Sequence, residues 1–228
     1  MHPLTASETL AVWEAGQERR PVERAVALLV AAGAASREEV LALPLGQRDG
    51  LLLTLRSWAF GARLGARGEC PACGAAVELD VAADDLRAPA ANGHVRHLAR
   101  DGVEVAFRPP SSGDVLDALD AAASSVSAPA RLLERCVAWA RAHGEGLDPG
   151  ELPAGMRAAV AEAMAEADPQ AVIELELVCP VCAKTWPAPL DLAGFFWAEL
   201  DAWARRTLRE VHVLASAYGW SEGAILDL

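Results

Sequence analysis

Two Cys-Pro-x-Cys pairs are the residues of this sequence best suited to chemistry. The first holds Cys70 and Cys73 in "CPACGAAVELD", and the second holds Cys179 and Cys182 in "CPVCAKTWPAPLD". Two residues between the cysteines of a pair let both sulfurs face one metal ion, while nearby backbone N–H groups donate to them. Two such turns supply the four thiolates of a tetrahedral site. We therefore expect one structural Zn²⁺ with these four cysteines as its ligands.

Other uses of these cysteines stay open from the sequence alone. A thioredoxin-like redox motif would have to open a helix after a strand, and neither pair has that context. Two local disulfides would need an oxidising compartment, and a catalytic zinc would need a coordination position that four thiolates do not leave. The structural site is favoured over all three. The fifth cysteine, Cys136, lies on the apolar face of "RLLERCVAWA", which indicates a buried structural thiol.

The remaining polar groups form no enzyme motif. His94 and His97 lie three residues apart in an extended region, on opposite faces of a strand, which is a poor arrangement for chelation. Asp114, Asp117 and Asp120 fit the charge bias of a helix start. No Gly-x-Ser-x-Gly, phosphate-binding glycine loop or H-E-x-x-H occurs. We expect a protein that is not an enzyme and has no small-molecule substrate.

Composition and charge further restrict the kind of protein that this chain can be. The chain has 228 residues, 53% of them hydrophobic and 23% charged, which is typical of folded domains. Its formal net charge of −12 argues against a nucleic-acid partner. The N-terminal "MHPLTASETLAVWEAG" lacks a secretion-signal pattern, and the longest apolar run, 25–35, is too short for a bilayer. We therefore expect a cytoplasmic protein, with reduced thiols and no membrane partner.

Helical patterns lead into both cysteine pairs. Pro21 fits the first turn of a helix that Gly33 ends, and Ser36 with Glu39 forms a capping box before a short helix. Asp191 is placed to cap the last long helix. The helices predicted beyond the first two cover 46–64, 114–123, 129–143, 156–167 and 192–218.

Strand patterns flank the same pairs. Residues 75–81 and 171–178 alternate in hydropathy, and 93–110 predicts a β-hairpin that turns at Asp101-Gly102. The predicted fold class is α+β, mostly helical, with a small β zinc ribbon assembled from the two knuckles and a β-hairpin. The expected segments form one compact unit: a helical region (1–66), the first knuckle and hairpin (67–110), a helical insert (111–170), and the second knuckle with the C-terminal helices (171–228).

Aromatic residues gather near the C-terminus, beside arginines. Core packing is the simplest explanation, but exposed Trp and Arg are favoured anchors of protein interfaces. The sequence "WARRTLREVH" also makes a locally basic spot in an acidic chain. The predicted partner-binding residues are Trp197, Trp203, Arg206, Tyr218 and Trp220.

Four stretches carry a family resemblance. They are "LPLGQRDGLLLTLRSWAFGARL", "VAFRPPSSGDVLDAL", "LLERCV" and "LELVCPVC…W…LDLAGFFWAELDAWARRTLREVHVLASAYGWSEGAIL". In their residues and in their order along the chain, they resemble the baseplate-protein family of contractile-tailed phages. Members of this family are also encoded in the gene clusters of extracellular contractile injection systems. The resemblance implies a structural component or assembly chaperone of the baseplate or hub. It also implies the four cysteines as zinc ligands and no catalytic residue.

The same resemblance implies where and with what the protein acts. Its partners would be baseplate, hub or spike proteins of the same particle, met in the cytoplasm during assembly, with incorporation in the particle as a further option. The alternative is that the chain is a zinc-ribbon nucleic-acid-binding regulatory protein. The arginines near Arg206 are the best support for this alternative in the sequence.

Overall fold

The computed structural model describes residues 1–123 and 127–227. Contacts divide the chain into two compact units. The first unit contains 1–40, 51–84 and 176–228, and the second contains 41–50 and 85–175. The four segments expected from the sequence are a different division and stay a prediction. None of the helices described combines the length and apolar character that crossing a bilayer requires.

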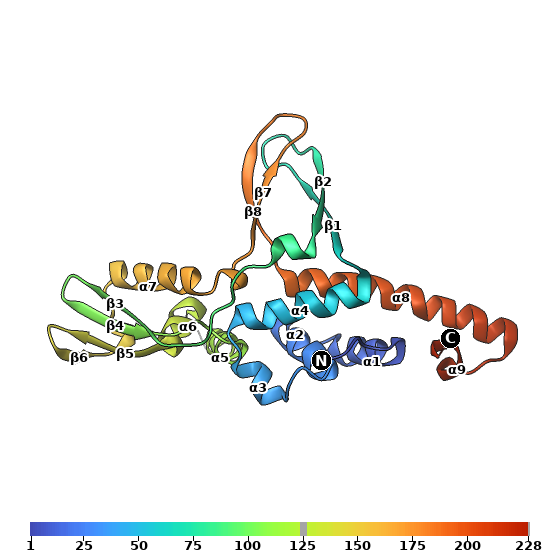
Figure 1. Ribbon diagram of the computed structural model, residues 1–228, viewed down its shortest axis with the longest axis horizontal. Coiled ribbons are helices and arrows are strands. Elements are labelled where there is room, and N and C mark those ends of the chain that lie inside the picture. The colour runs from blue at the N-terminus through green and yellow to red at the C-terminus, as the bar shows by residue number, and fades with distance from the viewer. Residues whose placement is uncertain (124–126, 228) are drawn as a thin grey trace. The chain divides into compact units, whose positions relative to one another are not determined.

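Figure 1 labels the helices of the first unit, and several of them begin or end at residues that favour those ends. Thr5 and Glu8 form a capping box, and Ser36 accepts from Glu39 N as expected. Gly219 ends the longest helix in the left-handed conformation, with φ 69°. These elements are α1 (Ala6–Gly16), α2 (Pro21–Ala31), α3 (Arg37–Ala42), α4 (Leu45–Phe60), α8 (Leu192–Tyr218) and α9 (Glu222–Leu226), of which α3 and α4 extend into the second unit.

The core of the first unit lies where α1, α2 and α4 meet α8. Gly16 lets the ring of Trp197 lie against α1, because a Cβ there would come within 2.3 Å of that ring. Phe60 and Phe196 pack edge to face with centroids 6.0 Å apart. The packing fixes the start of α8, the helix that follows the second cysteine pair.

Two hairpins carry the cysteine pairs at their turns (Figure 1). In the first, β1 (Arg63–Glu69) pairs antiparallel with β2 (Ala76–Ala82), and Glu69 lies opposite Ala76 just below the turn. In the second, β7 (Glu174–Val178) pairs with β8 (Thr185–Pro189).

The helix predicted over 46–64 is wrong at its C-terminal end. It stops at Phe60, because Gly61 takes a positive φ of 88°. Leu64 is buried, but it belongs to strand β1 and not to this helix.

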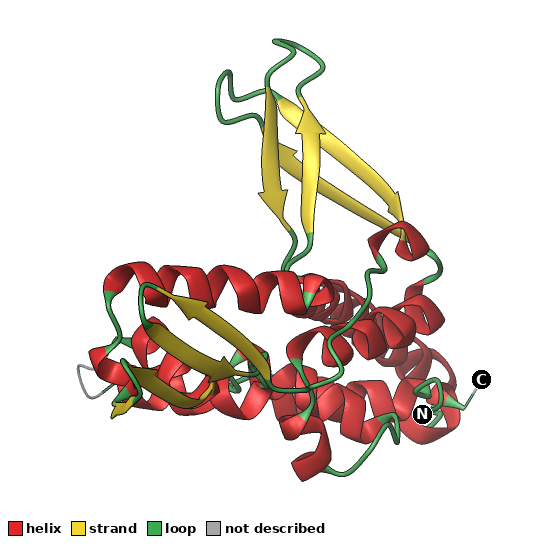
Figure 2. Cartoon of the chain, turned by 60° about the vertical axis from the view of Figure 1, so that its left-hand side comes forward, coloured by secondary structure: helices red, strands yellow, loops and turns green. Residues whose placement is uncertain are grey.

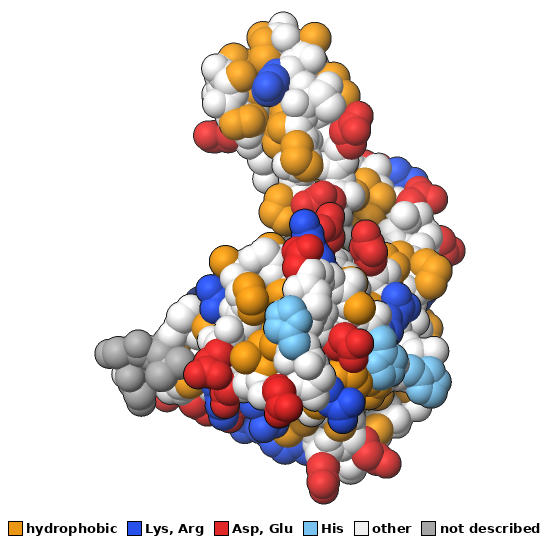
Figure 3. Space-filling view, turned by 90° about the vertical axis from the view of Figure 1, so that its left-hand side faces the viewer, with side chains coloured by type: hydrophobic (Ala, Val, Ile, Leu, Met, Phe, Trp, Pro, Cys, Tyr) orange, Lys and Arg blue, Asp and Glu red, His pale blue; other side chains and the backbone are white. Residues whose placement is uncertain are grey.

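The second unit packs a four-stranded antiparallel sheet against helices, which lie behind the sheet in Figure 2. Its core joins Val105 and Phe107 of the sheet to Met156 and Val160 of a helix. Acidic and basic side chains are interspersed on the face drawn in Figure 3. The strands are β3 (Arg96–Arg100), β4 (Val103–Phe107), β5 (Val137–Ala142) and β6 (Glu145–Leu147), and the helices are α5 (Ser112–Ala122), α6 (Ala128–Cys136) and α7 (Ala154–Ala167).

Two predictions about this sheet need correction. The hairpin around Asp101-Gly102 forms as predicted, with both residues at positive φ, but β4 pairs onward with β5 and not with the zinc-ribbon hairpins. The helix predicted over 129–143 ends at Cys136, and the residues after it form β5. Pairing with β4 places Trp139 opposite Ala106, and this tertiary pairing overrides the helical pattern. The α+β class itself is confirmed.

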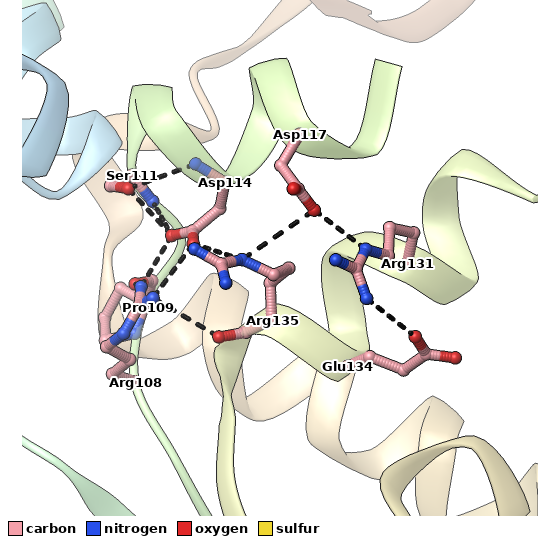
Figure 4. Close-up of polar contacts among 8 residues, drawn as sticks. All are labelled: Arg108, Pro109, Ser111, Asp114, Asp117, Arg131, Glu134 and Arg135. Atoms are coloured by element: carbon pink, nitrogen blue, oxygen red, sulfur yellow. Dashed lines mark hydrogen bonds and ion pairs between the residues drawn. The ribbon is translucent and has the colours of Figure 1, made fainter. Parts of the chain in front are cut away.

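A buried carboxylate joins three elements of the second unit (Figure 4). The side chain of Asp114 lies in a residue that is only 1% exposed. Its carboxylate accepts hydrogen bonds from Arg108 Nη1 and Nη2 at 2.6 and 2.9 Å, and from the Ser111 hydroxyl at 2.7 Å. Arg135 lies 3.5 Å away. Burial alone would raise the pKa of Asp114, but the hydrogen bonds from Arg108 and Ser111 outweigh it and hold the pKa below its usual range. The carboxylate thereby ties the start of α5 to the ends of β4 and α6.

Candidate metal centre

The four cysteine sulfurs of the two knuckles lie within 4.8 Å of one another. Two short sulfur–sulfur contacts cross between the hairpins, with Cys70 3.7 Å from Cys182 and Cys73 3.6 Å from Cys179. A tetrahedral zinc with Zn–S bonds of about 2.3 Å separates its sulfurs by about 3.8 Å. The sulfur positions therefore fit one tetrahedral ion, and the sequence prediction that the two pairs meet is confirmed.

The two knuckles make the same backbone turn. Gly74 N donates to Cys70 O at 2.9 Å, and Ala183 N donates to Cys179 O at 3.0 Å. The residue after each second cysteine is left-handed, with φ 70° at Gly74 and 58° at Ala183. Each turn thus presents its two sulfurs in the same way, although only the first uses the residue suited to that conformation.

Backbone donors favour the thiolate form of one ligand. The N–H groups of Cys182 and Val181 point at the Cys179 sulfur, at 3.5 and 3.4 Å, and they lower the pKa of Cys179 to about 6. At Cys73 the backbone of Ala75 acts in the same direction. There the neighbouring sulfurs of Cys182 and Cys179 outweigh it and raise the pKa to about 12.

These opposite shifts show what the cluster needs. Four sulfurs this close cannot all ionise by themselves, because thiolates repel one another. A divalent cation would remove that repulsion, and four soft sulfur donors in tetrahedral arrangement suit Zn²⁺. The residues present therefore fit the metal that the sequence predicts.

The cluster has an apolar floor. Cys70 and Cys179 are buried beside Val77, and Ala75 and Trp186 pack against them. Cys73 and Cys182 are exposed. Trp186 was not assigned to this site from the sequence. In strand β8, exposed and half-buried residues alternate, and this alternation places Trp186 on the inward side. With all four positions filled by thiolates, the centre can join the hairpins but leaves no place for a substrate.

Other predicted residues lie apart from this cluster. Cys136 is a buried thiol as predicted, and burial together with the charge of Asp114 raises its pKa to about 12. The His97 ring lies 5.7 Å from the Trp139 ring. Among the described residues, the four cysteines are the one group that could hold a metal ion.

The predicted partner-binding residues differ in accessibility. Trp197 is only 8% exposed and packs under the Arg24 guanidinium, 4.6 Å from the ring centre, and Trp203 is half-buried. Arg206, Tyr218 and Trp220 are exposed. Binding of a partner by these five residues stays a prediction, which accessibility favours for the last three.

Comparisons with known proteins give one match. Searches of curated proteins and of solved structures found none. The model of the family described as T4 bacteriophage base plate protein matches residues 3–197. This range is well over half of the chain, includes both cysteine pairs and ends inside α8. The chain therefore belongs to the T4 bacteriophage base plate protein family.

Proposed function

We propose that this protein is a zinc-stabilised, non-enzymatic component or assembly chaperone of the baseplate or hub of a phage-tail-like contractile injection system. The observation that carries the proposal is the family match over residues 3–197. Its partners are baseplate, hub or spike proteins of the same particle. It meets them in the cytoplasm, where the particle is assembled.

In this function the role of the metal is to stabilise the fold. Cys70 and Cys73 on one hairpin and Cys179 and Cys182 on the other would hold one zinc, which supplies no reaction here and only cross-links the hairpins. The ligands of the two hairpins are 106 and 112 residues apart in sequence. Closing such long loops costs conformational entropy, which metal binding offsets. The ribbon would thereby keep the helices at its base, including the start of α8, in one arrangement for partner binding.

Two other functions have less support. A nucleic-acid-binding regulator would need a basic face, and the net charge of −12 opposes one. An enzyme would need a polar pocket with reactive groups. The largely apolar pocket of about 290 Å³ in the second unit has Asp168 as its one charged lining residue, and that carboxylate accepts from Gly46 N and Ala91 N.

Deleting the gene from a strain that produces the particles tests the proposal. We expect electron microscopy to show no complete particles in the deletion strain, and wild-type protein supplied in trans to restore them. Normal particles in the deletion strain would refute the proposed function. Mass spectrometry of purified particles then separates the two roles, because a component stays in them and a chaperone does not.

The nucleic-acid alternative has its own readout. Binding of the purified protein to duplex DNA or RNA at low salt, weakening steeply as salt rises, would favour it over the assembly role. We expect no such binding.

A further inference from the structure

Helix α8 changes its surroundings along its length. Up to Ala204 a buried stripe faces α1 and α2, with Leu200 1% and Ala204 0% exposed. Beyond Ala204, Val211 is the one buried residue among those described in α8. Figure 1 shows these last turns running past the end of α4. The distal part of α8 is therefore a helix with most of its surface in solvent.

The short helix α9 covers one side of this distal part and leaves the rest open. Ile225 of α9 is 8% exposed, and α9 contacts both α8 and α1. Val213 and Tyr218 stay 63% and 64% exposed, and Trp220 46%. Apolar groups of this size in solvent are typical of a surface that a partner covers.

The two exposed aromatic rings are held in place. Tyr218 and Trp220 stack with centroids 5.0 Å apart and planes 25° from parallel. The left-handed Gly219 between them turns the chain so that the rings can meet. Tyr218 lies about half a turn around the helix from Arg209, so the ring pair is on a different side of α8 from that arginine.

The charge of this surface is opposite to that of the chain. Arg206, Arg209, Glu210, Val213 and Leu214 lie together on an open stretch of the α8 surface. Arg206 lies 3.9 Å from Glu210, and Arg209 has no ion-pair partner in the part of the chain described. The chain as a whole carries −12. This stretch of α8 therefore offers arginine donors that carboxylates of a partner can use.

From these positions we propose that the distal surface, defined as Arg206, Arg209, Val213 and Leu214, binds an acidic amphipathic helix of another baseplate protein. This inference rests on the proposed function. Residues of this set recur at helical steps of three and four, so they lie along one side of α8, where the side chains of a second helix can pack between them. That helix places apolar residues against Val213 and Leu214, and Asp or Glu side chains against the two arginines.

The charges also distinguish this occupant from others. In a twofold pairing of two copies through this face, the arginines near its centre would approach those of the partner copy, and like charges repel. Nucleic acid would meet the arginines but also the field of an acidic protein. A helix with carboxylates beside its apolar stripe meets neither obstacle.

Site-specific photocrosslinking in the strain that produces the particles tests the inference. Benzoylphenylalanine replaces Val213 in the full-length chain, and the matched control carries it at Val172, which is 52% exposed in the second unit. We expect the Val213 position to crosslink to one baseplate protein, through a peptide with Asp or Glu beside apolar residues at helical spacing. The control position should not give this product. A crosslink to a second copy or to nucleic acid, or none, would overturn the inference.

Charge reversal supplies the second arm. Arg209→Glu should reduce that crosslink at least about 10-fold, while Arg157→Glu, the same change on the exposed surface of α7, should leave it unchanged. Equal crosslinking in both variants, at wild-type zinc content and helicity, would also overturn the inference. If Arg209→Glu assembles normal particles and the deletion strain does not, the surface is wrong and the proposed function stands.

Discussion

At the scale of single residues, the two knuckle turns differ in the residue that takes the left-handed conformation. Gly74 adopts φ 70° without strain, and no atom lies within 4 Å of where a Cβ would be. Ala183 adopts φ 58° with a Cβ present. A left-handed residue other than glycine costs about 1–2 kcal/mol, so the second knuckle stores strain that the first lacks.

Exchanging these residues should therefore have opposite effects on stability. Gly74→Ala should lower the free energy of unfolding of the metal-loaded protein by about 1–2 kcal/mol. Ala183→Gly should raise it by roughly 0–1 kcal/mol, because the relief of strain exceeds the entropy cost of glycine. Urea unfolding monitored by circular dichroism measures both. Two changes of the same sign would contradict the shared turn.

At the scale of elements, α4 and α8 are joined by an ion pair between buried Arg56 and half-buried Glu199. Arg56, 2% exposed, donates to Glu199 at 2.8 and 2.5 Å and to Gly61 O at 2.7 Å. The pair fixes the end of α4, from which the first hairpin starts. Removing one partner leaves a buried charge without its counter-charge.

Glu199→Ala should accordingly lower the free energy of unfolding by about 2–3 kcal/mol. The matched control is Glu78→Ala, which breaks the exposed Arg67–Glu78 pair and should cost less than about 1 kcal/mol. Chemical denaturation of the two variants gives the comparison. Equal losses would show that the α4–α8 pair does not hold the elements together.

The Asp114 network that joins α5, α6 and β4 predicts a dependence on pH. Its folded-state pKa is lowered from the ordinary 3.8, so its stabilising effect is complete above about pH 4 and is lost as the pH falls through the folded pKa. Asp114→Asn should lose about 1–3 kcal/mol at pH 7, and the loss should become smaller as the pH falls below the ordinary pKa of 3.8. Glu162→Gln on the exposed face of α7 is the control. Thermal unfolding from pH 3 to 7 tests this, and an equal loss at every pH would contradict it.

The elements also show how far the sequence predicts the fold. The caps at Ser36 and Asp191 and the turn at Asp101-Gly102 are local signals, and each prediction made from them is confirmed. Strand β1 was missed because "RLGARGE" has few β-forming residues, and its order comes from pairing with β2.

The other errors of the sequence prediction concern contacts between residues that are far apart in the chain. The change from helix to strand after Cys136, and the assignment of the β3–β4 hairpin to its sheet, depend on which strand lies beside β4. Local pattern does not contain that information. The meeting of the four cysteines was predictable, because paired Cys-Pro-x-Cys turns are a specific signal for one shared metal site. Trp186 was not assigned to the metal site, because β8 was not among the predicted strands. Arg209 was noted only as part of a basic stretch.

At the scale of the whole molecule, the metal centre belongs to one compact unit. The four cysteines lie in the first unit, and the sheet of β3 to β6 lies in the second. Loss of the metal should therefore act on the first unit directly, because the hairpins lose their cross-link.

Hydrogen–deuterium exchange with and without a zinc chelator tests this distinction. We expect protection to fall in peptides covering β1–β2 and β7–β8, and to stay unchanged in peptides covering β4 and α7. Protection unchanged everywhere would show that no metal closes the ribbon. Equal loss in both units would show that they unfold together.

We propose that one zinc ion, held by four thiolates, joins the two hairpins. Elemental analysis of protein purified without added metal is the decisive measurement. We predict one zinc per chain in the wild type and in Cys136→Ser, which changes a buried thiol outside the cluster. Cys70→Ser and Cys179→Ser should give insoluble or zinc-free protein. Wild-type protein without bound metal, or double serine variants that stay soluble with unchanged melting, would contradict the claim.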